Sequence, residues 1–396
     1  MKNFIFISPN FPANYWRFCR ALKNDGWRVL GIGDQPYEEL LPELKDSLQE
    51  YYKVSNLENY DEVFRAVAFF TFMYGKIDYL ESNNEYWLER DALLRTEFNI
   101  TTGFQKTDVK KIKYKSQMKR YYKKAGVKTA KHCQAKKLET CQKLIKEVGY
   151  PVIVKPDNGV GASDTHKINN EEELALFLKH RNKKVAYVME EYINGEICSY
   201  DAIIDSKGNP VFETGNITPE SLMDVVNNGD TSTFYIVNEL AEDIRKLGRK
   251  TVKAFKVKSR FIHFEFFRLL SDQRIGKKGE VVALEVNMRP AGGIAPDMMN
   301  YANSTDVYRI WADVITEDKS SVEIGEKFFC AFAGRRDGRE YRYHEQDIID
   351  KYGYAIKIID RVPQVLSNTM GNLMYVARFK TEEELKNFYN DVAELK

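Results

Sequence analysis

Polar side chains in two otherwise apolar stretches could together bind a metal ion and phosphate. In HFEFFRLL, strand alternation puts His263 and Glu265 on one face, and in LEVNMRP it puts Glu285, Asn287 and Arg289 on one face. An ionised carboxylate in so apolar a strand is costly unless it is paired or metal-bound. Two carboxylates and an amide oxygen are hard ligands suited to Mg²⁺, and an arginine beyond them offers a rigid fork for an oxyanion. A pair of salt-bridged edge strands is the alternative, and it leaves the amide unexplained.

A lysine followed by a glycine-rich loop forms a second candidate, in PVIVKPDNGVGASDTHKI. An apolar strand delivers Lys155, and the loop supplies Gly159, Gly161 and Ser163, whose backbone N–H groups could fold over an anion. The loop is not a Walker A loop, because GxxxxGK[ST] occurs nowhere in the chain and the lysine here precedes the glycines. A solvated lysine on a surface hairpin is the alternative interpretation.

A run of acids follows a third apolar strand, in VMEEYINGEICSY. Glu190 and Glu191 end the strand, and Glu196 follows Gly195. A strand end that leads into a connector can offer backbone groups to the edge of a purine, while an acid can bind ribose hydroxyls. Acidic turns after strands are common and mostly solvated, so this pattern alone is weak.

The elements at the start of the chain predict a small doubly wound domain. Residues 3–8 and 28–33 are short runs rich in β-formers, and the stretch between them has helical periodicity with a glycine stop at Gly26, which indicates a β-α-β unit. A helix over 61–75 and a strand over 76–82 continue the pattern. The single GIG lacks the third glycine of a dinucleotide fingerprint, so NAD binding is not expected.

Downstream, the patterns predict α+β folding. A basic helix is expected over roughly 108–125, a helix capped by Asn170 over the stretch NNEEELALFLKH, and a hairpin around 205–209. Residues 216–233 are polar and weakly periodic, which is typical of a mobile loop. A helix over 239–256 precedes the two polar-bearing strands, and if these pair across their charged turn, their acidic faces lie side by side.

From about residue 325 the chain changes character. Three strand patterns, FFCAFAG, AIKIIDRV and NLMYVARF, precede a helix capped by Thr381, which predicts a small α+β tail. Earlier in the chain, SNNEYWLERDALLR, residues 82–95, is polar and aromatic enough to belong to a site, although a helix at a domain interface explains it equally well. His263 could contact substrate or only orient the neighbouring acid.

Composition narrows the classes of function. The chain has 396 residues, 60 basic and 58 acidic, and a net charge of +2, which calls for neither nucleic acid nor an anionic membrane as a partner. No apolar run approaches the length of a spanning helix or of a signal peptide, so we expect a cytoplasmic protein. The five cysteines are scattered and never form a CxxC pair, which argues against a disulfide framework and a zinc site.

Taken in this order, the pieces resemble the ATP-grasp superfamily, and the resemblance runs over most of the chain. It implies an α/β and α+β fold: an N-terminal doubly wound pre-ATP-grasp domain over residues 1–110, an ATP-grasp domain with two α+β subdomains over 111–325, and a small α+β C-terminal domain over 326–396. The lid subdomain of the ATP-grasp domain is expected at about 128–192.

The resemblance also implies a role for each motif residue. Lys115 in YKSQMK is similar to the first nucleotide-binding lysine, although relatives usually have aspartate where this chain has Tyr114. Lys155 resembles the second, at the α-phosphate, and Arg289 resembles the arginine that steadies the phosphorylated intermediate. The remaining implied roles are the phosphate loop at Gly159, Gly161 and Ser163, the adenine hinge at Glu190, Glu191, Tyr192 and Ile193, the ribose acid at Glu196, and the magnesium ligands at Glu265, Glu285 and Asn287.

The segment EVNMRPAGGIAPDMM looks most like carboxylate–amine ligases. The implied reaction uses ATP and Mg²⁺, or Mn²⁺, to convert a small carboxylate into an acyl phosphate, which an amine attacks to give an amide such as a dipeptide, with the glycine loop and residues 216–233 as lids. A second copy of the chain is a further expected partner, by analogy with relatives. Nucleic acid and membrane are not expected as partners. Activation of bicarbonate, as in biotin carboxylases and carbamoyl phosphate synthases, and a non-catalytic ATP-binding regulator are the alternatives.

Overall fold

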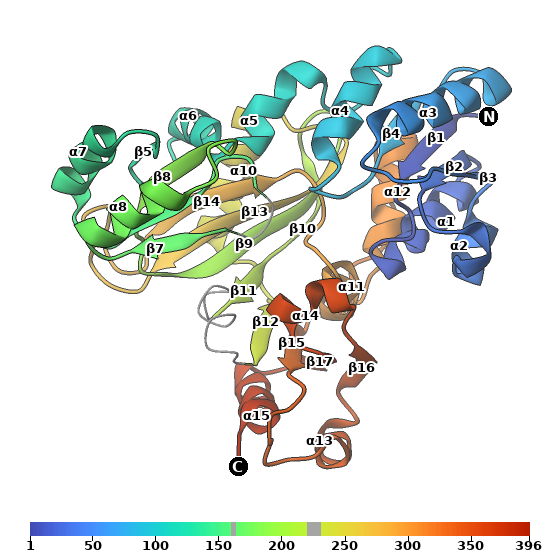
Figure 1. The fold of residues 1–396 in the computed structure, drawn as a ribbon. Helices are drawn as coiled ribbons and strands as arrows, with labels where there is room; N and C mark the ends of the chain where they lie inside the picture. The colour runs from blue at the N-terminus through green and yellow to red at the C-terminus, as the bar shows by residue number, and fades with distance from the viewer. Residues whose placement is uncertain (160–163, 220–230) are drawn as a thin grey trace.

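The N-terminal part of the chain is a four-stranded parallel sheet in the order β3-β2-β1-β4 (Figure 1). The computed structural model describes residues 1–159, 164–219 and 231–396. The doubly wound domain predicted for this region is confirmed. Its strands are β1 (Asn3–Ile7), β2 (Arg28–Gly33), β3 (Glu50–Lys53) and β4 (Tyr79–Glu81), and its helices are η1 (Ala13–Tyr15), α1 (Trp16–Asn24), η2 (Tyr37–Glu39), α2 (Pro42–Ser47), α3 (Tyr60–Tyr74) and α4 (Leu88–Glu97).

The predicted basic helix is two helices, so the expectation of one continuous helix is wrong. After η3 (Lys106–Asp108), α5 (Val109–Lys113) and α6 (Lys115–Ala125) are separated at Tyr114, whose φ of −92° and ψ of 114° are extended. The break leaves the first amides of α6 free of intrahelical partners. The carboxylate of Asp157 accepts hydrogen bonds of 2.7 Å from both the amide and the hydroxyl of Ser116. These bonds tie the start of α6 to the end of strand β6 (Val152–Pro156).

A second, antiparallel sheet in the order β5-β8-β6-β7 forms what we call the lid sheet. The side chain of Asn170 caps the helix that follows β7 by accepting from the Glu173 amide at 2.9 Å, as the sequence predicted. The elements are β5 (His132–Gln134), α7 (Leu138–Val148), β6 (Val152–Pro156), β7 (His166–Ile168), α8 (Glu171–His180) and β8 (Tyr187–Glu191).

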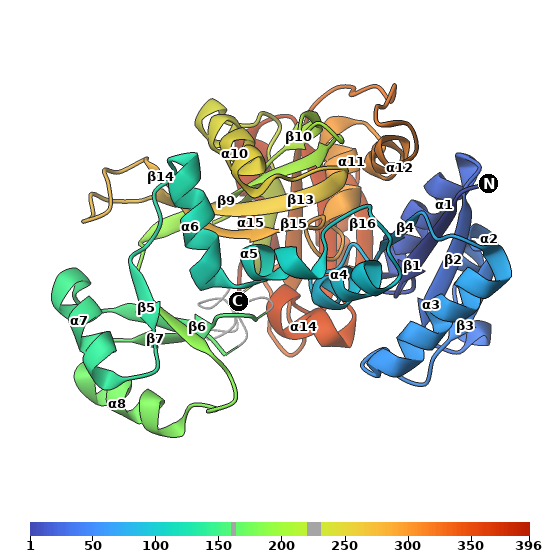
Figure 2. The same cartoon turned by 90° about the horizontal axis from the view of Figure 1, so that it is seen from above.

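The largest sheet has nine strands among the described residues, ordered β14-β13-β9-β11-β12-β15-β17-β16, with β10 paired to β9. Figure 2 shows it between the lid sheet and the N-terminal sheet. Its strands are β9 (Gly195–Ile204), β10 (Pro210–Thr214), β11 (Asn216–Thr218), β12 (Ser232–Ile236), β13 (Arg260–Leu269), β14 (Val281–Asn287), β15 (Phe329–Arg335), β16 (Ile356–Arg361) and β17 (Leu373–Phe379), and its helices are α10 (Glu242–Phe255), α11 (Ala295–Asn303), α12 (Val307–Glu317), α13 (Glu345–Tyr352), α14 (Gln364–Met370) and α15 (Glu382–Ala393).

Two features of this sheet differ from the sequence patterns. The loop predicted over 216–233 is wrong at both ends, because β11 and β12 pair with each other and β11 pairs with β9; residues 220–230 lie outside the described residues. The strands of the C-terminal segment do not form a sheet of their own, since β15 pairs with β12 over residues 330–334 and with β17 on its other side over residues 329–335. The domain boundaries expected from the sequence stay predictions.

The N-terminal sheet and the nine-stranded sheet share one hydrophobic core. Phe4 and Phe18 lie with ring centroids 5.8 Å and 5.0 Å from that of Trp311 on α12, and Phe18 is 4.7 Å from Tyr308. All four side chains are buried. This packing holds the loops at the carboxyl end of the N-terminal strands against the segment that follows β14. No helix among the described residues combines the length and apolarity needed to cross a bilayer.

Candidate functional site

The two predicted acids face each other across a pair of neighbouring strands. β13 and β14 are antiparallel, with Glu265 opposite Glu285 and His263 opposite Asn287. A register shift between Glu265 and Phe266 interrupts the ladder at this point. The predicted pairing of the two strands, with their acidic faces side by side, is therefore confirmed. Two carboxylates at this spacing repel each other unless cations are placed around them.

Among the described residues, each carboxylate forms one direct ion pair. The Nζ atom of Lys115 is 3.2 Å from Oε2 of Glu285 and donates a hydrogen bond of 3.0 Å to the carbonyl of Gly159. The Nε2 atom of His263 is 3.0 Å from Oε1 of Glu265. Burial raises the pKa of Glu265, but the hydrogen bond from His263 and its charge outweigh burial and hold that pKa below its ordinary value. The acid is therefore ionised at neutral pH.

The set expected to hold magnesium has donors of the right kind. One oxygen of Glu265 and one of Glu285 has no hydrogen bond or ion pair to a described residue, and the buried Nδ2 atom of Asn287 has no hydrogen-bond partner among them. No three His, Cys, Asp or Glu side chains converge as a metal site within the described ranges, so the amide would have to complete the set. Carboxylate and amide oxygens suit Mg²⁺, so these residues fit the ion.

Glu190 lies between two buried lysines. Its Oε2 atom is 2.8 Å from Nζ of Lys155, and its Oε1 atom is 2.8 Å from Nζ of Lys119. Burial alone would raise the pKa of Glu190, but Lys119 and Lys155 together hold that pKa far below its ordinary value. Burial lowers the pKa of Lys155, yet Glu190 and Glu285 outweigh burial, so that pKa is raised and the ammonium stays charged.

The sequence interpretation missed Lys119. It lies four residues after Lys115 on α6, so the two side chains project from the same side of the helix. Burial lowers the pKa of Lys119, although Glu190 partly offsets that effect. The contact with Glu190 lacks hydrogen-bond geometry, and Nζ of Lys119 has no hydrogen-bond partner in the described structure. The i, i+4 spacing in YKSQMK was the signal that could have identified it.

The sequence interpretation also missed an acid, Asp201. Its Oδ1 atom is 2.7 Å from Nδ1 of His263, and it accepts a short hydrogen bond from the hydroxyl of Ser199. Asp201 faces His263 across the β9–β13 ladder, and Ser199 faces Glu265. Burial lowers the pKa of His263, but Asp201 and Glu265 outweigh burial and raise that pKa to about 9. His263 is therefore a buried cation that orients Glu265.

The stretch expected to form the adenine hinge joins the lid sheet to β9. Arg274 donates two hydrogen bonds to the carboxylate of Glu191, one of 2.8 Å from its Nε atom. The ammonium of Lys167 lies 4.6 Å from the centroid of the Tyr192 ring, and Ile193 is buried beside Leu269. These contacts fix the course of the backbone on both sides of the connector.

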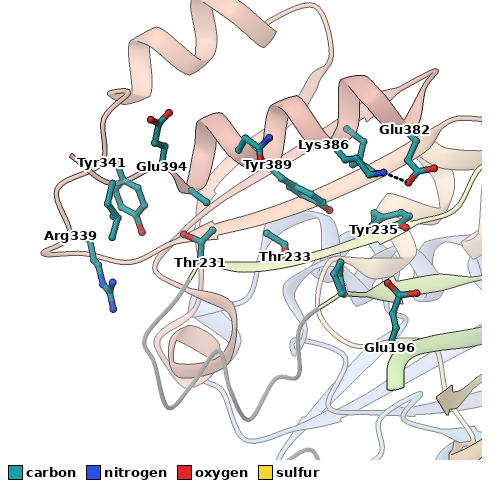
Figure 3. A pocket seen from close by; sticks show the side chains of 15 residues that line it. Glu196, Thr231, Thr233, Tyr235, Arg339, Tyr341, Glu382, Lys386, Tyr389 and Glu394 are labelled. Atoms are coloured by element: carbon teal, nitrogen blue, oxygen red, sulfur yellow. Dashed lines mark ion pairs between the residues drawn. The ribbon is translucent and has the colours of Figure 1, made fainter. Parts of the chain in front are cut away.

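Glu196 is not brought to this cluster, and its implied role at the ribose stays a prediction. Strand alternation puts it on the face of Cys198 and Tyr200, whereas Ser199 and Asp201 lie on the face of His263. Glu196 instead lines a cavity of about 800 Å³ between β12 and α15 (Figure 3). Burial raises its pKa above the ordinary value. A role for Glu196 at the ribose has no support in this geometry.

The glycine loop begins at β6. Gly159 is described and its carbonyl accepts from Lys115, but Gly161 and Ser163 lie outside the described residues. Before the loop, Asp157 is buried against α6 and also accepts from Nε2 of Gln134 at 3.0 Å. The chain therefore enters the loop from a fixed position.

Arg289 follows β14 on the side of the N-terminal sheet. Its Nη1 atom donates to the carbonyl of Pro290 at 2.7 Å, and its charge contributes to the lowered pKa of Glu265. Arg260 donates to the carbonyl of Met288 at 2.7 Å and pairs with Glu81 at the end of β4. The guanidinium of Arg289 is thus held near the acids from a backbone that is anchored to the N-terminal sheet.

Comparison with known proteins identifies the fold that carries this site. The sequence model of the ATP-grasp domain family matches residues 148–297. Among curated proteins, a carbamoyl phosphate synthase large chain from Caldanaerobacter subterraneus is 25% identical over 245 residues, 60% of this chain, and a C-terminal section of that protein from Aquifex aeolicus is 23% identical over 221 residues, 52% of this chain. The chain covers only 21% and 39% of these two relatives.

Solved structures match over the whole length. An L-amino acid ligase from Bacillus licheniformis has a TM-score of 0.74 at 15% identity, over 99% of this chain and 97% of that one. The biotin carboxylase domain of a Hydrogenobacter thermophilus 2-oxoglutarate carboxylase has a TM-score of 0.71 at 16% identity, over 100% and 90%. At these identities the likeness shows a shared fold. The family match and the fold together show that the chain contains an ATP-grasp domain.

Proposed function

We propose that the protein is an ATP- and Mg²⁺-dependent carboxylate–amine ligase. In the first step a substrate carboxylate oxygen attacks the γ-phosphorus of ATP, which forms an acyl phosphate and releases ADP. An amine then attacks the acyl carbon, the bond to phosphate breaks, and the products are an amide and inorganic phosphate. The observation that carries the proposal is the cluster of buried lysines beside the facing acids Glu265 and Glu285.

The charge of this cluster favours a polyanion. Lys115, Lys119 and Lys155 are all buried, and among the described residues only Glu190 and Glu285 form ion pairs with them. Three cations against two anions leave one buried positive charge, which is costly without an anionic ligand. The phosphates of ATP supply that anion, and the connector from Glu190 to Ile193 would hold the base. Phosphoryl transfer asks a protein mainly for alignment and charge neutralisation, which such residues provide.

The metal would be held by Glu265, Glu285 and Asn287. A bound Mg²⁺ would neutralise negative charge on the phosphates, and Mn²⁺ prefers similar ligands. His263 keeps Glu265 ionised and oriented, because its ring lies between that acid and Asp201. Arg289 would stabilise the charge that develops on the transferred phosphoryl group and on the acyl phosphate.

An ATP-dependent phosphate-release screen tests the proposal. Pairs of small carboxylates and amines, amino acids among them, are incubated with the protein, ATP and Mg²⁺, and products are identified by mass spectrometry. We expect phosphate release that requires both an acid and an amine, with ADP, phosphate and amide formed in equal amounts. Absence of an amide across a broad library, or formation of AMP and pyrophosphate, would contradict the proposal.

A second candidate is ATP-dependent activation of bicarbonate. It is favoured by the carbamoyl phosphate synthase large chains among the sequence relatives and by the biotin carboxylase domain among the structural neighbours. Bicarbonate is itself a carboxylate, so the same lysines, acids and Arg289 could serve the first step. ATP cleavage that depends on bicarbonate and needs no organic acid would select this candidate over the ligase.

A further inference from the structure

The segment after β4 lies at a position where parallel sheets commonly bind ligands. β1 pairs with β2 on one side and with β4 on the other. The chain adds β2 and β3 outward from β1 and then returns to place β4 on the opposite side, so the strand order reverses between β1 and β4. Ligands of open α/β sheets bind outside the carboxyl ends of the strands at such a switch point. Ser82, Asn83 and Glu85 follow β4 directly and are buried, at 0%, 1% and 6% exposure.

Contacts on one side connect this segment to the lysines of the site. Nζ of Lys113 donates to the carbonyl of Glu85 at 2.7 Å and lies 3.1 Å from its Oε1 atom. Lys113 is two residues before Lys115, which contacts Glu285. Farther along, Nδ2 of Asn158 donates to Glu89 at 3.3 Å, just before the glycine loop. The segment therefore borders the proposed phosphate site.

Contacts on the other side connect it to Arg289. The buried hydroxyl of Tyr15 donates to the carbonyl of Asn83 at 2.9 Å. Burial raises the pKa of Tyr15, and the charge of Arg289 partly offsets that effect. Asn83 is thus held on the side of Tyr15 and Glu85 on the side of Lys113, so the segment runs from the N-terminal sheet to the helices that carry the site lysines.

Two polar atoms of this segment have no hydrogen bond to a described residue. They are Nδ2 of Asn83, a donor, and Oε2 of Glu85, an acceptor. A buried polar atom left unsatisfied costs about 1–3 kcal/mol, so such atoms are commonly satisfied by a ligand or water. A ligand that satisfies both must carry an acceptor for Asn83 and a donor for Glu85.

We infer that Asn83 and Glu85 form the subsite of the acid substrate and that this substrate is an α-amino acid. The Glu85 carboxylate accepts from the substrate ammonium group, and the Asn83 amide donates to a substrate carboxylate oxygen on the side of Arg289. The amino group is then held in hydrogen bonds by Glu85, which directs the substrate to react through its carboxylate. The inference rests on the proposed ligase activity and adds the class of its acid.

Matched pairs of acids test the inference on the wild-type protein. Alanine is compared with propionate, and phenylalanine with 3-phenylpropionate, as the acid in ATP-dependent phosphate release with a fixed amine. We expect kcat/KM for the amino acid to exceed that of its deaminated partner by at least a hundredfold. Equal values for both members of each pair would overturn the inference while leaving the ligase activity in place.

Variants assign the effect to the segment. Glu85→Gln and Asn83→Ala should each raise KM for amino acids more than tenfold and leave KM for ATP unchanged. Glu97→Gln, at the exposed end of α4, the helix that follows this segment, should change neither. Unchanged KM for amino acids in folded Glu85→Gln and Asn83→Ala would overturn the assignment.

Calorimetry separates this inference from the proposed function. Alanine and phenylalanine are titrated into the wild-type protein with and without a non-hydrolysable ATP analogue and Mg²⁺. Binding to the wild type that is lost in Glu85→Gln would support the subsite even if no acid releases phosphate, a result that would count against the ligase alone. Absence of amino-acid binding under both conditions would overturn the subsite.

Discussion

The buried contact between Lys119 and Glu190 makes a quantitative prediction. At 2.8 Å, and with an effective dielectric constant of about 20, the Coulomb attraction is about 6 kcal/mol before desolvation is subtracted. Both side chains are only 5% exposed, so removing the partner of a buried charge costs about 3–5 kcal/mol. Glu190 keeps Lys155 when Lys119 is replaced, which lowers the expected coupling between Lys119 and Glu190 to about 2–3 kcal/mol.

A double-mutant cycle measures that coupling. The wild type, Lys119→Met, Glu190→Gln and the double variant are unfolded in urea without nucleotide, and each free energy of unfolding is obtained by circular dichroism. The double variant should lose about 2–3 kcal/mol less than the sum of the single losses. The exposed pair Lys128 and Glu280, with side chains 52% and 41% exposed, is the matched control and should couple by less than about 1 kcal/mol. Additive losses for the buried pair, within about 0.5 kcal/mol, would refute the reasoning.

Three further predictions concern single residues of the site. Lys155→Ala should weaken ATP binding measured by calorimetry by about tenfold or more, while Lys146→Ala on the exposed face of α7 should not. Unchanged affinity in Lys155→Ala would favour the interpretation of Lys155 as a solvated surface lysine. Glu285→Gln should lower kcat by about a hundredfold or more with an unchanged circular dichroism spectrum, and near-wild-type turnover would contradict its role at the metal. Because the pKa of His263 is raised to about 9 from about 6.5 in an unfolded chain, its interactions stabilise the metal-free protein fully below pH 6.5 and are lost as the pH rises through 9. The advantage of wild type over His263→Gln in free energy of unfolding should therefore fall by about 3 kcal/mol across that range, and an advantage independent of pH would contradict the assignment.

The facing acids could be predicted from sequence because strand geometry leaves few alternatives. A period of two fixes which side chains share a face, and a short charged turn between two apolar stretches makes antiparallel pairing the natural outcome, so Glu265 and Glu285 were expected together. The same rule shows why Glu196 lies away from this cluster. Glu196 and Asp201 lie on the same strand an odd number of residues apart, so their side chains point to opposite faces of the sheet.

Other features depend on contacts that are distant in sequence. Tyr114 ends α5 and lets α6 begin at Lys115, and α6 is held there by Asp157, some forty residues later, so helical periodicity alone predicted one helix. The addition of β15 to the sheet through β12 is likewise a pairing between remote strands, and the short β11 is too brief to show a period. Lys119 was within reach of sequence reasoning, since it lies one helical turn from Lys115, but its pairing with Glu190 was not.

The central claim is that a substrate carboxylate is phosphorylated by ATP, and isotope transfer tests it most directly. An acid labelled with ¹⁸O in its carboxylate is turned over with unlabelled ATP, an amine and Mg²⁺, and the released phosphate is analysed by mass spectrometry. Transfer through an acyl phosphate predicts one ¹⁸O atom in the phosphate for each amide formed. Phosphate that carries no label, with the amide still formed, would contradict the account.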